Sequence, residues 1–129
     1  MEKWIDNIKK NNLYRFSQPA DITKIKNAEK HLLVEFAPDY VDLLQCIGSC
    51  MCFGHEINGL TEKENLNVIL ATEEQREKNP DIPADWYAIE DTHMDGIVIW
   101  QNKNSEIYQS KPGSPPQKIA SNLEQLINI

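Results

Sequence analysis

The spacing of apolar residues changes along this chain, and that change constrains the possible fold more than any other feature. In the first half, apolar side chains recur at intervals of three and four residues, which places them on one face of a helix. There are two such sets: Ile22, Ile25, Ala28 and Leu32, and then Tyr40, Leu43, Leu44 and Ile47. From residue 87 the period becomes two, as in a strand with two different faces. Helices followed by consecutive strands predict an α+β domain with an antiparallel sheet.

Shorter patterns add detail to this prediction. The sheet is expected to have about four to six strands, flanked by N-terminal helices and a C-terminal helix. A short first helix is expected around Ile5 and Ile8 and should end near Asn11. Pro38 suits the first turn of the third helix, because the missing N–H has no partner there in any case. Gly48 is expected to end that helix.

The second half is predicted segment by segment. Residues 50–57 are expected to form one strand, and residues 65–79 to start extended at Val68 and then become helical. Residues 96–100 are apolar on both faces, which is typical of a central strand. Residues 111–116 are rich in proline and predict a loop before a last helix that begins at Ile119. Gly59 and Gly96 are expected at turns that need a positive φ.

Length and composition indicate one domain, residues 1–129. The 129 residues are 40% hydrophobic and 26% charged, which are globular values. The longest aliphatic runs have about four residues, whereas a membrane-spanning helix needs roughly 20. Residues 1–6 contain acids and lack the apolar core of a secretory signal. We therefore expect a cytoplasmic protein without membrane contact.

The formal net charge of −7 is unevenly distributed. Residues 31–102 contain fourteen acidic and three basic residues, and no base lies between Lys78 and Lys103. Such a surface repels the phosphates of nucleic acids, which argues against nucleic-acid binding. It attracts basic proteins and speeds encounter with them. The alternative is that the negative charge serves only solubility.

Six residues are predicted to contact a partner protein: Glu56, Asp85, Trp86, Glu90, Asp91 and Asp95. Trp is enriched among the residues that dominate binding energy at interfaces, although Trp86 also suits a core position that caps the sheet. Glu90, Asp91, His93 and Asp95 could instead be a hydrolase carboxylate set or a divalent-metal loop. A calcium loop requires several oxygens at fixed short spacing and a turning glycine, so no metal is expected here.

Three cysteines and a histidine lie within ten residues: Cys46, Cys50, Cys52 and His55. Four such ligands could bind zinc, or a thiol paired with His55 could act as a nucleophile. The spacing contains no pair of cysteines separated by two residues, and no oxyanion hole is recognisable nearby. Small buried thiols between helix and sheet are the simpler interpretation. Reduced thiols are expected, because the number is odd and no secretory signal precedes them.

A series of short motifs spans nearly the whole chain in a fixed order: Ala28-Glu29, Ala37-Pro38, Tyr40, Leu43-Leu44, Gly48, Gly59-Leu60, Thr72, Arg76, Trp86, Ile89 and Ile119-Ala120-Ser121. This order resembles the SMI1/KNR4 superfamily, also called SUKH domains. Two positions depart from the family pattern. The usual Leu-Pro is Ala37-Pro38 here, and the Asn-Gly after the third helix is Ile47-Gly48-Ser49.

The resemblance implies a non-enzymatic protein-binding module without a cofactor. Many bacterial members resemble immunity proteins, which are made beside a polymorphic toxin and bind its toxic domain, often a nuclease. Fungal members act as scaffolds in cell-wall regulation. The first hypothesis is therefore an immunity protein that neutralises a toxin through its acidic surface. The alternatives are an intracellular scaffold that binds a peptide or protein, and a small zinc protein or hydrolase built on the cysteines. The oligomeric state is left open.

Overall fold

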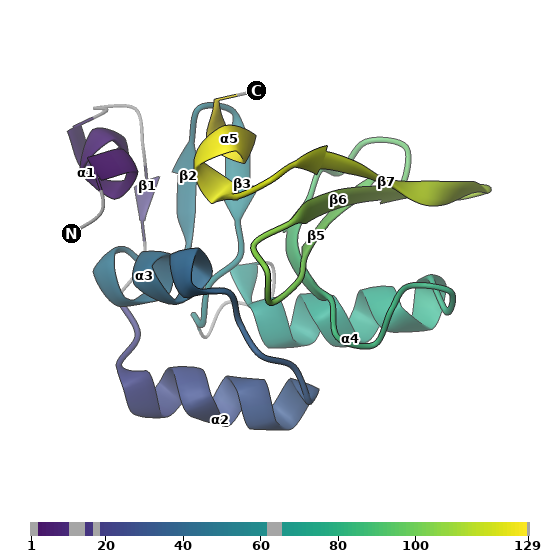
Figure 1. The fold of residues 1–129 in the computed structure, drawn as a ribbon, viewed down its shortest axis with the longest axis horizontal. Coiled ribbons are helices and arrows are strands. Elements are labelled where there is room, and N and C mark those ends of the chain that lie inside the picture. Colours follow the sequence, from purple (N-terminus) through teal and green to yellow (C-terminus); the bar gives the residue numbers. More distant parts are fainter. Residues whose placement is uncertain (1–2, 11–14, 17–18, 62–65, 129) are drawn as a thin grey trace.

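The computed structural model describes residues 3–10, 15–16, 19–61 and 66–128, which form five helices and seven strands (Figure 1). The helices are α1 (Lys3–Lys10), α2 (Ile22–Leu32), α3 (Pro38–Cys46), α4 (Val68–Lys78) and α5 (Leu123–Ile127). The strands are β1 (Arg15–Phe16), β2 (Cys50–Cys52), β3 (His55–Ile57), β4 (Tyr87–Asp91), β5 (Val98–Gln101), β6 (Ile107–Lys111) and β7 (Ser114–Ala120). The predicted α+β class is confirmed. The predicted end of the first helix near Asn11 lies outside the described residues.

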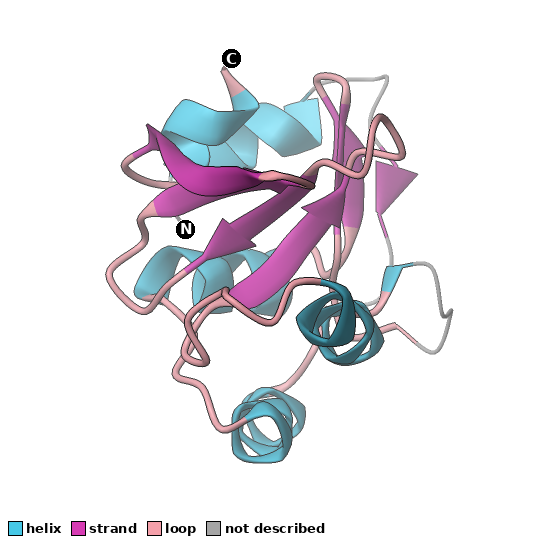
Figure 2. Ribbon diagram, turned by 90° about the vertical axis from the view of Figure 1, so that its right-hand side faces the viewer, coloured by secondary structure: helices cyan, strands magenta, loops and turns pink. Residues whose placement is uncertain are grey.

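The strands form two antiparallel sheets, with helices above and below them in the view of Figure 2. One sheet has the order β1-β2-β3 and the other the order β4-β5-β6-β7. The inner strand β5 is buried along its whole length, as predicted for residues 96–100. One face of the four-stranded sheet joins the main core with Tyr87 and Ile99. The opposite face buries Trp86 and Trp100 in a smaller cluster, against which Ala71 of α4 packs.

The N-terminal helices follow their apolar patterns. Ile25, Ala28 and Leu32 of α2 are buried, whereas Ile22 is 47% exposed because it is the first residue of that helix. Every apolar residue predicted for the buried face of α3 is buried. Pro38 occupies the first turn of α3, as expected.

Residues 50–57 form a hairpin, so the prediction of one continuous strand was wrong. Phe53 and Gly54 connect β2 to β3 and have positive φ values of 51° and 83°. Two consecutive positive φ values are characteristic of the type I′ turn, which favours Asn, Asp or Gly at its first central position. A phenylalanine at that position conceals the turn from sequence patterns.

The start of α4 also differs from the prediction. Val68 was expected to be extended, but the helix begins there because Asn67 caps it. The Asn67 side-chain oxygen accepts hydrogen bonds from the backbone N–H groups of Ile69 (2.8 Å) and Leu70 (3.2 Å). Such a cap satisfies N–H groups that have no partner within the helix.

Residues 114–116 of the segment predicted as a proline loop belong to strand β7, and the last helix begins at Leu123 instead of Ile119. Pro115 and Pro116 cannot donate hydrogen bonds, but β7 is an edge strand and its pairing with β6 is irregular at this point, which tolerates prolines. Asn122 then caps α5 by accepting a hydrogen bond from the N–H of Gln125 (2.9 Å).

Gly59 and Gly96, the two glycines predicted at turns, are required for different reasons. Gly96 has a φ of +72°, as predicted. Gly59 does not have a positive φ, so the prediction was wrong for it. Its reason is close approach, because a Cβ there would meet the backbone of Gly48 and Ser49.

Asn58 connects the two sheets. Its N–H donates to the carbonyl of Ile89 (2.7 Å), and its side-chain amide donates to the carbonyl of Ala88 (3.1 Å). Its own carbonyl accepts from the Tyr40 hydroxyl of α3 (2.5 Å). Asn58 is only 3% exposed, so these hydrogen bonds are shielded from water. One buried residue thus joins the end of β3 to the first strand of the other sheet.

Candidate protein-binding surface

Two of the predicted contact residues meet around one histidine. The Glu56 carboxylate lies 3.8 Å from Nε2 of His93, and the Asp91 carboxylate lies 3.9 Å from Nδ1 of the same ring. The side chains of Glu56 and Asp91 are 40% and 41% exposed. Asp95 is exposed on the loop that follows β4. The fold therefore places Glu56 of β3 beside the end of β4, although 35 residues separate Glu56 from Asp91 in the sequence.

The loop that carries His93 is held by its own hydrogen bonds. The Thr92 hydroxyl donates to the carbonyl of Ile97 (2.8 Å), and the N–H of His93 donates to the Asp91 carboxylate (2.8 Å). The N–H of Ile97 donates to the carbonyl of Met94 (2.9 Å) and closes the tip of the loop. These bonds hold the loop in a defined conformation.

Glu90 does not belong to this surface, so its prediction as a contact residue is corrected. It is 4% exposed, and both of its carboxylate oxygens are bound within the domain. One oxygen lies 2.9 Å from Nδ1 of His55, and the other accepts from the N–H of Glu56 (2.8 Å). The hydrogen bond to Glu90 raises the pKa of His55, against the opposing effect of burial. Glu90 and His55 thus connect β4 to β3, and the contact is an ion pair when His55 is protonated.

A break in the strand alternation explains this burial. The pairing register of β4 with β5 shifts between Ala88 and Glu90, as at a β-bulge. A bulge adds a residue to one strand and turns the following side chains. The simple period of two that predicted an outward Glu90 does not hold across that point.

Trp86 and Asp85 also lie apart from the acidic group. Trp86 is 8% exposed and stacks on Tyr108 with ring centroids 4.2 Å apart, so the core interpretation of this residue is the correct one. Asp85 is exposed but precedes β4, whereas Asp91 ends that strand. The two carboxylates therefore flank opposite ends of the same strand.

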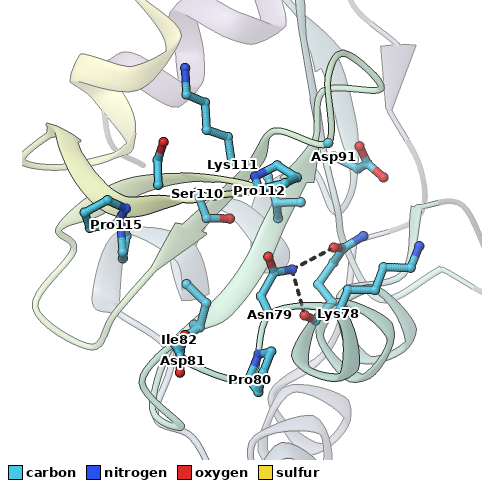
Figure 3. A pocket seen from close by; sticks show the side chains of 16 residues that line it. Lys78, Asn79, Pro80, Asp81, Ile82, Asp91, Ser110, Lys111, Pro112 and Pro115 are labelled. Atoms are coloured by element: carbon cyan, nitrogen blue, oxygen red, sulfur yellow. Dashed lines mark hydrogen bonds between the residues drawn. The ribbon is translucent and has the colours of Figure 1, made fainter.

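A groove that no sequence pattern predicted lies between the end of α4 and the turn from β6 to β7 (Figure 3). It has a volume of about 730 Å³ and is lined by prolines, by Ile82 and Val98, and by the polar side chains of Gln75 and Ser110. Asp81, Asp91, Lys78 and Lys111 contribute charges of both signs. Four separate segments form this groove, so it becomes recognisable only in the folded chain. We call it the proline groove.

The cysteines do not converge on a metal site. The sulfur atoms of Cys50 and Cys52 lie 3.7 Å apart, and Cys46 is half-buried on α3. The hydrogen bond between Cys50 and Cys52 lowers the pKa of Cys52 and raises that of Cys50. Within residues 3–10, 15–16, 19–61 and 66–128, no group of three or more His, Cys, Asp or Glu side chains is placed to hold a metal ion.

Two of the motif residues quoted above have structural roles. Thr72 is fully buried, and its hydroxyl accepts a hydrogen bond from the N–H of Ala88 (2.9 Å). Arg76 donates through Nη2 to the carbonyls of Leu32 (3.1 Å) and Ala84 (2.8 Å). These contacts attach α4 to β4, to the end of α2 and to the loop before β4. Thr72 and Arg76 therefore stabilise the arrangement of the helices and strands.

Comparison with known proteins agrees with this scaffold. A family model described as SMI1-KNR4 cell-wall matches residues 22–127, which is most of the chain. No curated protein matches the chain. Among the described helices, none combines the length and the hydrophobicity that crossing a bilayer requires.

Proposed function

The chain belongs to the SMI1/KNR4 (SUKH) family, and from this premise we propose that it is a non-enzymatic, cytoplasmic protein-binding domain of the immunity type. It neutralises a cognate toxin domain, for example a nuclease, by binding over its basic surface. The family match supports a binding module of this kind. The negative charge of the chain supports a basic partner.

The observation that carries the proposal is the convergence of Glu56 and Asp91 on one exposed rim, with Asp95 on the same loop. A protein that handles nucleic acid presents lysines and arginines around its active cleft. Carboxylates on a preformed loop are complementary to such a cleft and accelerate encounter with it. Close charge pairs in tight complexes can contribute several kcal/mol each.

The test is a triple charge reversal, Glu56→Lys, Asp91→Lys and Asp95→Lys, measured by association kinetics with the toxin domain encoded in the neighbouring reading frame. Reversal should lower the association rate at low salt by about tenfold or more, and the difference should shrink as salt screens the charges. Glu90 is left intact in this variant because it is buried with His55.

A matched control changes the charge equally elsewhere. Glu35, Glu77 and Glu124 are exposed and lie outside this rim, so their reversal to Lys should leave most of the association rate intact. Equal losses in the two triple variants would show that only the net charge matters. An unchanged rate in the first variant would remove Glu56, Asp91 and Asp95 from the binding surface.

The proline groove favours a second candidate function, an intracellular scaffold that binds a peptide. Its volume of about 730 Å³ is of the size that ligand-binding clefts have. The genomic neighbour distinguishes the two functions, because a large protein with a variable C-terminal toxin domain supports the immunity function. A scaffold would lose its partner on substitution of Ile82 in the groove and would be insensitive to reversal of Glu56 and Asp95, which do not line the groove.

A further inference from the structure

Exposed apolar side chains gather beside the acidic rim. Among the described residues, six large hydrophobic side chains are exposed, and three of them lie on the β2–β3 hairpin and on the loop after β4. Met51 is 41% exposed, Phe53 45% and Met94 63%. Scattered exposed apolar residues are ordinary, whereas a group of them rimmed by polar residues indicates an interaction site.

Strand pairing and one side-chain contact relate Met51 and Met94 to the carboxylates, and Phe53 lies two residues after Met51 at the tip of the same hairpin. Met51 is the direct partner of Glu56 across β2 and β3, so the two side chains project from the same face of the hairpin. Glu56 in turn contacts His93, which directly precedes Met94. We refer to Met51, Phe53, Glu56, Asp91, Met94 and Asp95 together as the turn surface.

Phe53 occupies a backbone conformation that is unfavourable for it. Its φ is +51°, at the first central position of a tight turn where Asn, Asp or Gly is preferred. His93 and Asp95 also have positive φ. Of the five described non-glycine residues with a positive φ, three therefore lie on the β2–β3 turn and on the loop after β4. Strained residues of this kind cluster where a protein binds or reacts. An aromatic ring that is both strained and half-exposed adds little to the stability of the isolated domain.

We infer that the turn surface is the docking site for a basic protein surface with an apolar recess, in which Phe53 and Met94 are the central anchors and Glu56, Asp91 and Asp95 form the charged rim. This inference rests on the proposed function and names the residues that hold the partner once it has been attracted. Such an arrangement matches the usual anatomy of an interface, in which a few buried anchors dominate the affinity and charged residues surround them.

Charge complementarity selects this occupant. The only positively chargeable side chain in contact with Glu56 among the described residues is His93, so a lysine- or arginine-rich partner would supply the missing cations. A second copy of the chain in a symmetric dimer would bring the same carboxylates face to face, which is repulsive. Nucleic acid and anionic lipid are repelled for the same reason.

The test uses Phe53→Asn and Met94→Ser, each measured for binding to the catalytically inactivated toxin domain of the neighbouring reading frame and for its melting temperature. Either substitution should speed dissociation by at least about tenfold, since anchors act mainly on the dissociation rate. The melting temperature of Phe53→Asn should equal or exceed that of the wild type, because asparagine suits the turn.

Leu33→Asn is the matched control. Leu33 is also a non-glycine residue with positive φ, at +58°, and is 86% exposed, but it ends α2 and lies outside the turn surface. This control removes an exposed aliphatic side chain from the same strained conformation and should leave both binding rates unchanged. Faster dissociation in Leu33→Asn would show that loss of exposed apolar area at any site weakens the complex, and this would overturn the assignment.

The possible outcomes separate the inference from the function on which it rests. If the wild type binds the toxin domain and Phe53→Asn and Met94→Ser bind equally well, the turn surface is not the docking site, but the immunity function stands. If the wild type binds no such domain, the proposed function fails and the inference fails with it. If Phe53→Asn melts several degrees below the wild type, Phe53 supports the fold and its role as an anchor is rejected.

Discussion

Replacing Gly59 with alanine should force two backbone segments apart. The added Cβ would lie 2.8 Å from Cα of Ser49 and 2.9 Å from the carbonyl carbon of Gly48, and closer still to the backbone nitrogen of Ser49. Carbon atoms in van der Waals contact are separated by about 3.5–4.0 Å. Because all three neighbours are backbone atoms, no side-chain rotation can relieve the clash.

The size of the effect follows from these contacts. Overpacking of a well-packed site costs about 1–3 kcal/mol. The required shift also strains two hydrogen bonds of Gly59. The N–H of Gly59 donates to the carbonyl of Leu66 (2.9 Å), and the carbonyl of Gly59 accepts from the N–H of Val68 (2.8 Å). Each is worth about 1 kcal/mol. We therefore expect Gly59→Ala to lower the free energy of unfolding by about 3–5 kcal/mol, and the melting temperature by about 10–20 °C.

Urea unfolding followed by circular dichroism measures this difference, and Gly113→Ala is the control. Gly113 has a φ of +80° and no atom within 4 Å of an added Cβ, so alanine there meets only the cost of the left-handed conformation, about 1 kcal/mol. A Gly59→Ala variant that is no less stable than Gly113→Ala would refute the argument from close approach.

Two further predictions concern buried polar contacts. Thr72→Val should lower the free energy of unfolding by about 1–3 kcal/mol, because it leaves the N–H of Ala88 without its acceptor. Thr72→Ser keeps the hydroxyl and should cost less. Equal losses of stability for the two variants, measured by thermal melting, would contradict this. His55→Asn should destabilise the domain more at pH 6 than at pH 9, as followed by urea unfolding across pH. Since Glu90 raises the pKa of His55, the stabilisation is present below the unfolded pKa of about 6.5 and is lost as pH rises through the folded value. The same substitution at the exposed His31 is the control. An effect of His55→Asn on stability that is constant with pH would exclude the ion pair between His55 and Glu90.

The helices could be predicted from sequence because their apolar spacing is a local property. The buried residues of α3 follow the period of a helix, and the sheet packs on the face that this period defines. Where the chain uses residues against their usual preference, sequence patterns failed. Phe53 occupies a turn position that favours asparagine or glycine, and Pro115 and Pro116 lie within a strand.

The proposed binding surface was predictable only in part, because its members are brought together by tertiary contacts. The acidic bias of residues 31–102 led to the prediction of Glu56, Asp91 and Asp95 as contact residues, and the structure shows that Glu56 and Asp91 lie beside the same histidine. It could not distinguish them from Glu90, whose partner His55 lies 35 residues away and whose orientation depends on a bulge. The exposure of Met51 and Met94 could not be predicted, since Met51 lies between two cysteines in β2 and Met94 is a single apolar residue in a polar loop.

The position of Asn58 has a consequence for recognition. Met51 and Phe53 belong to the three-stranded sheet, whereas Met94 belongs to a loop of the four-stranded one, and the hydrogen bonds of Asn58 hold the first sheet against the second. Together with Glu90, which binds His55 and Glu56, this interior amide sets the distance between the two halves of the proposed docking site. On that proposal, a variant at Asn58 that keeps each sheet folded would still weaken binding, because the distance between Phe53 and Met94 would change.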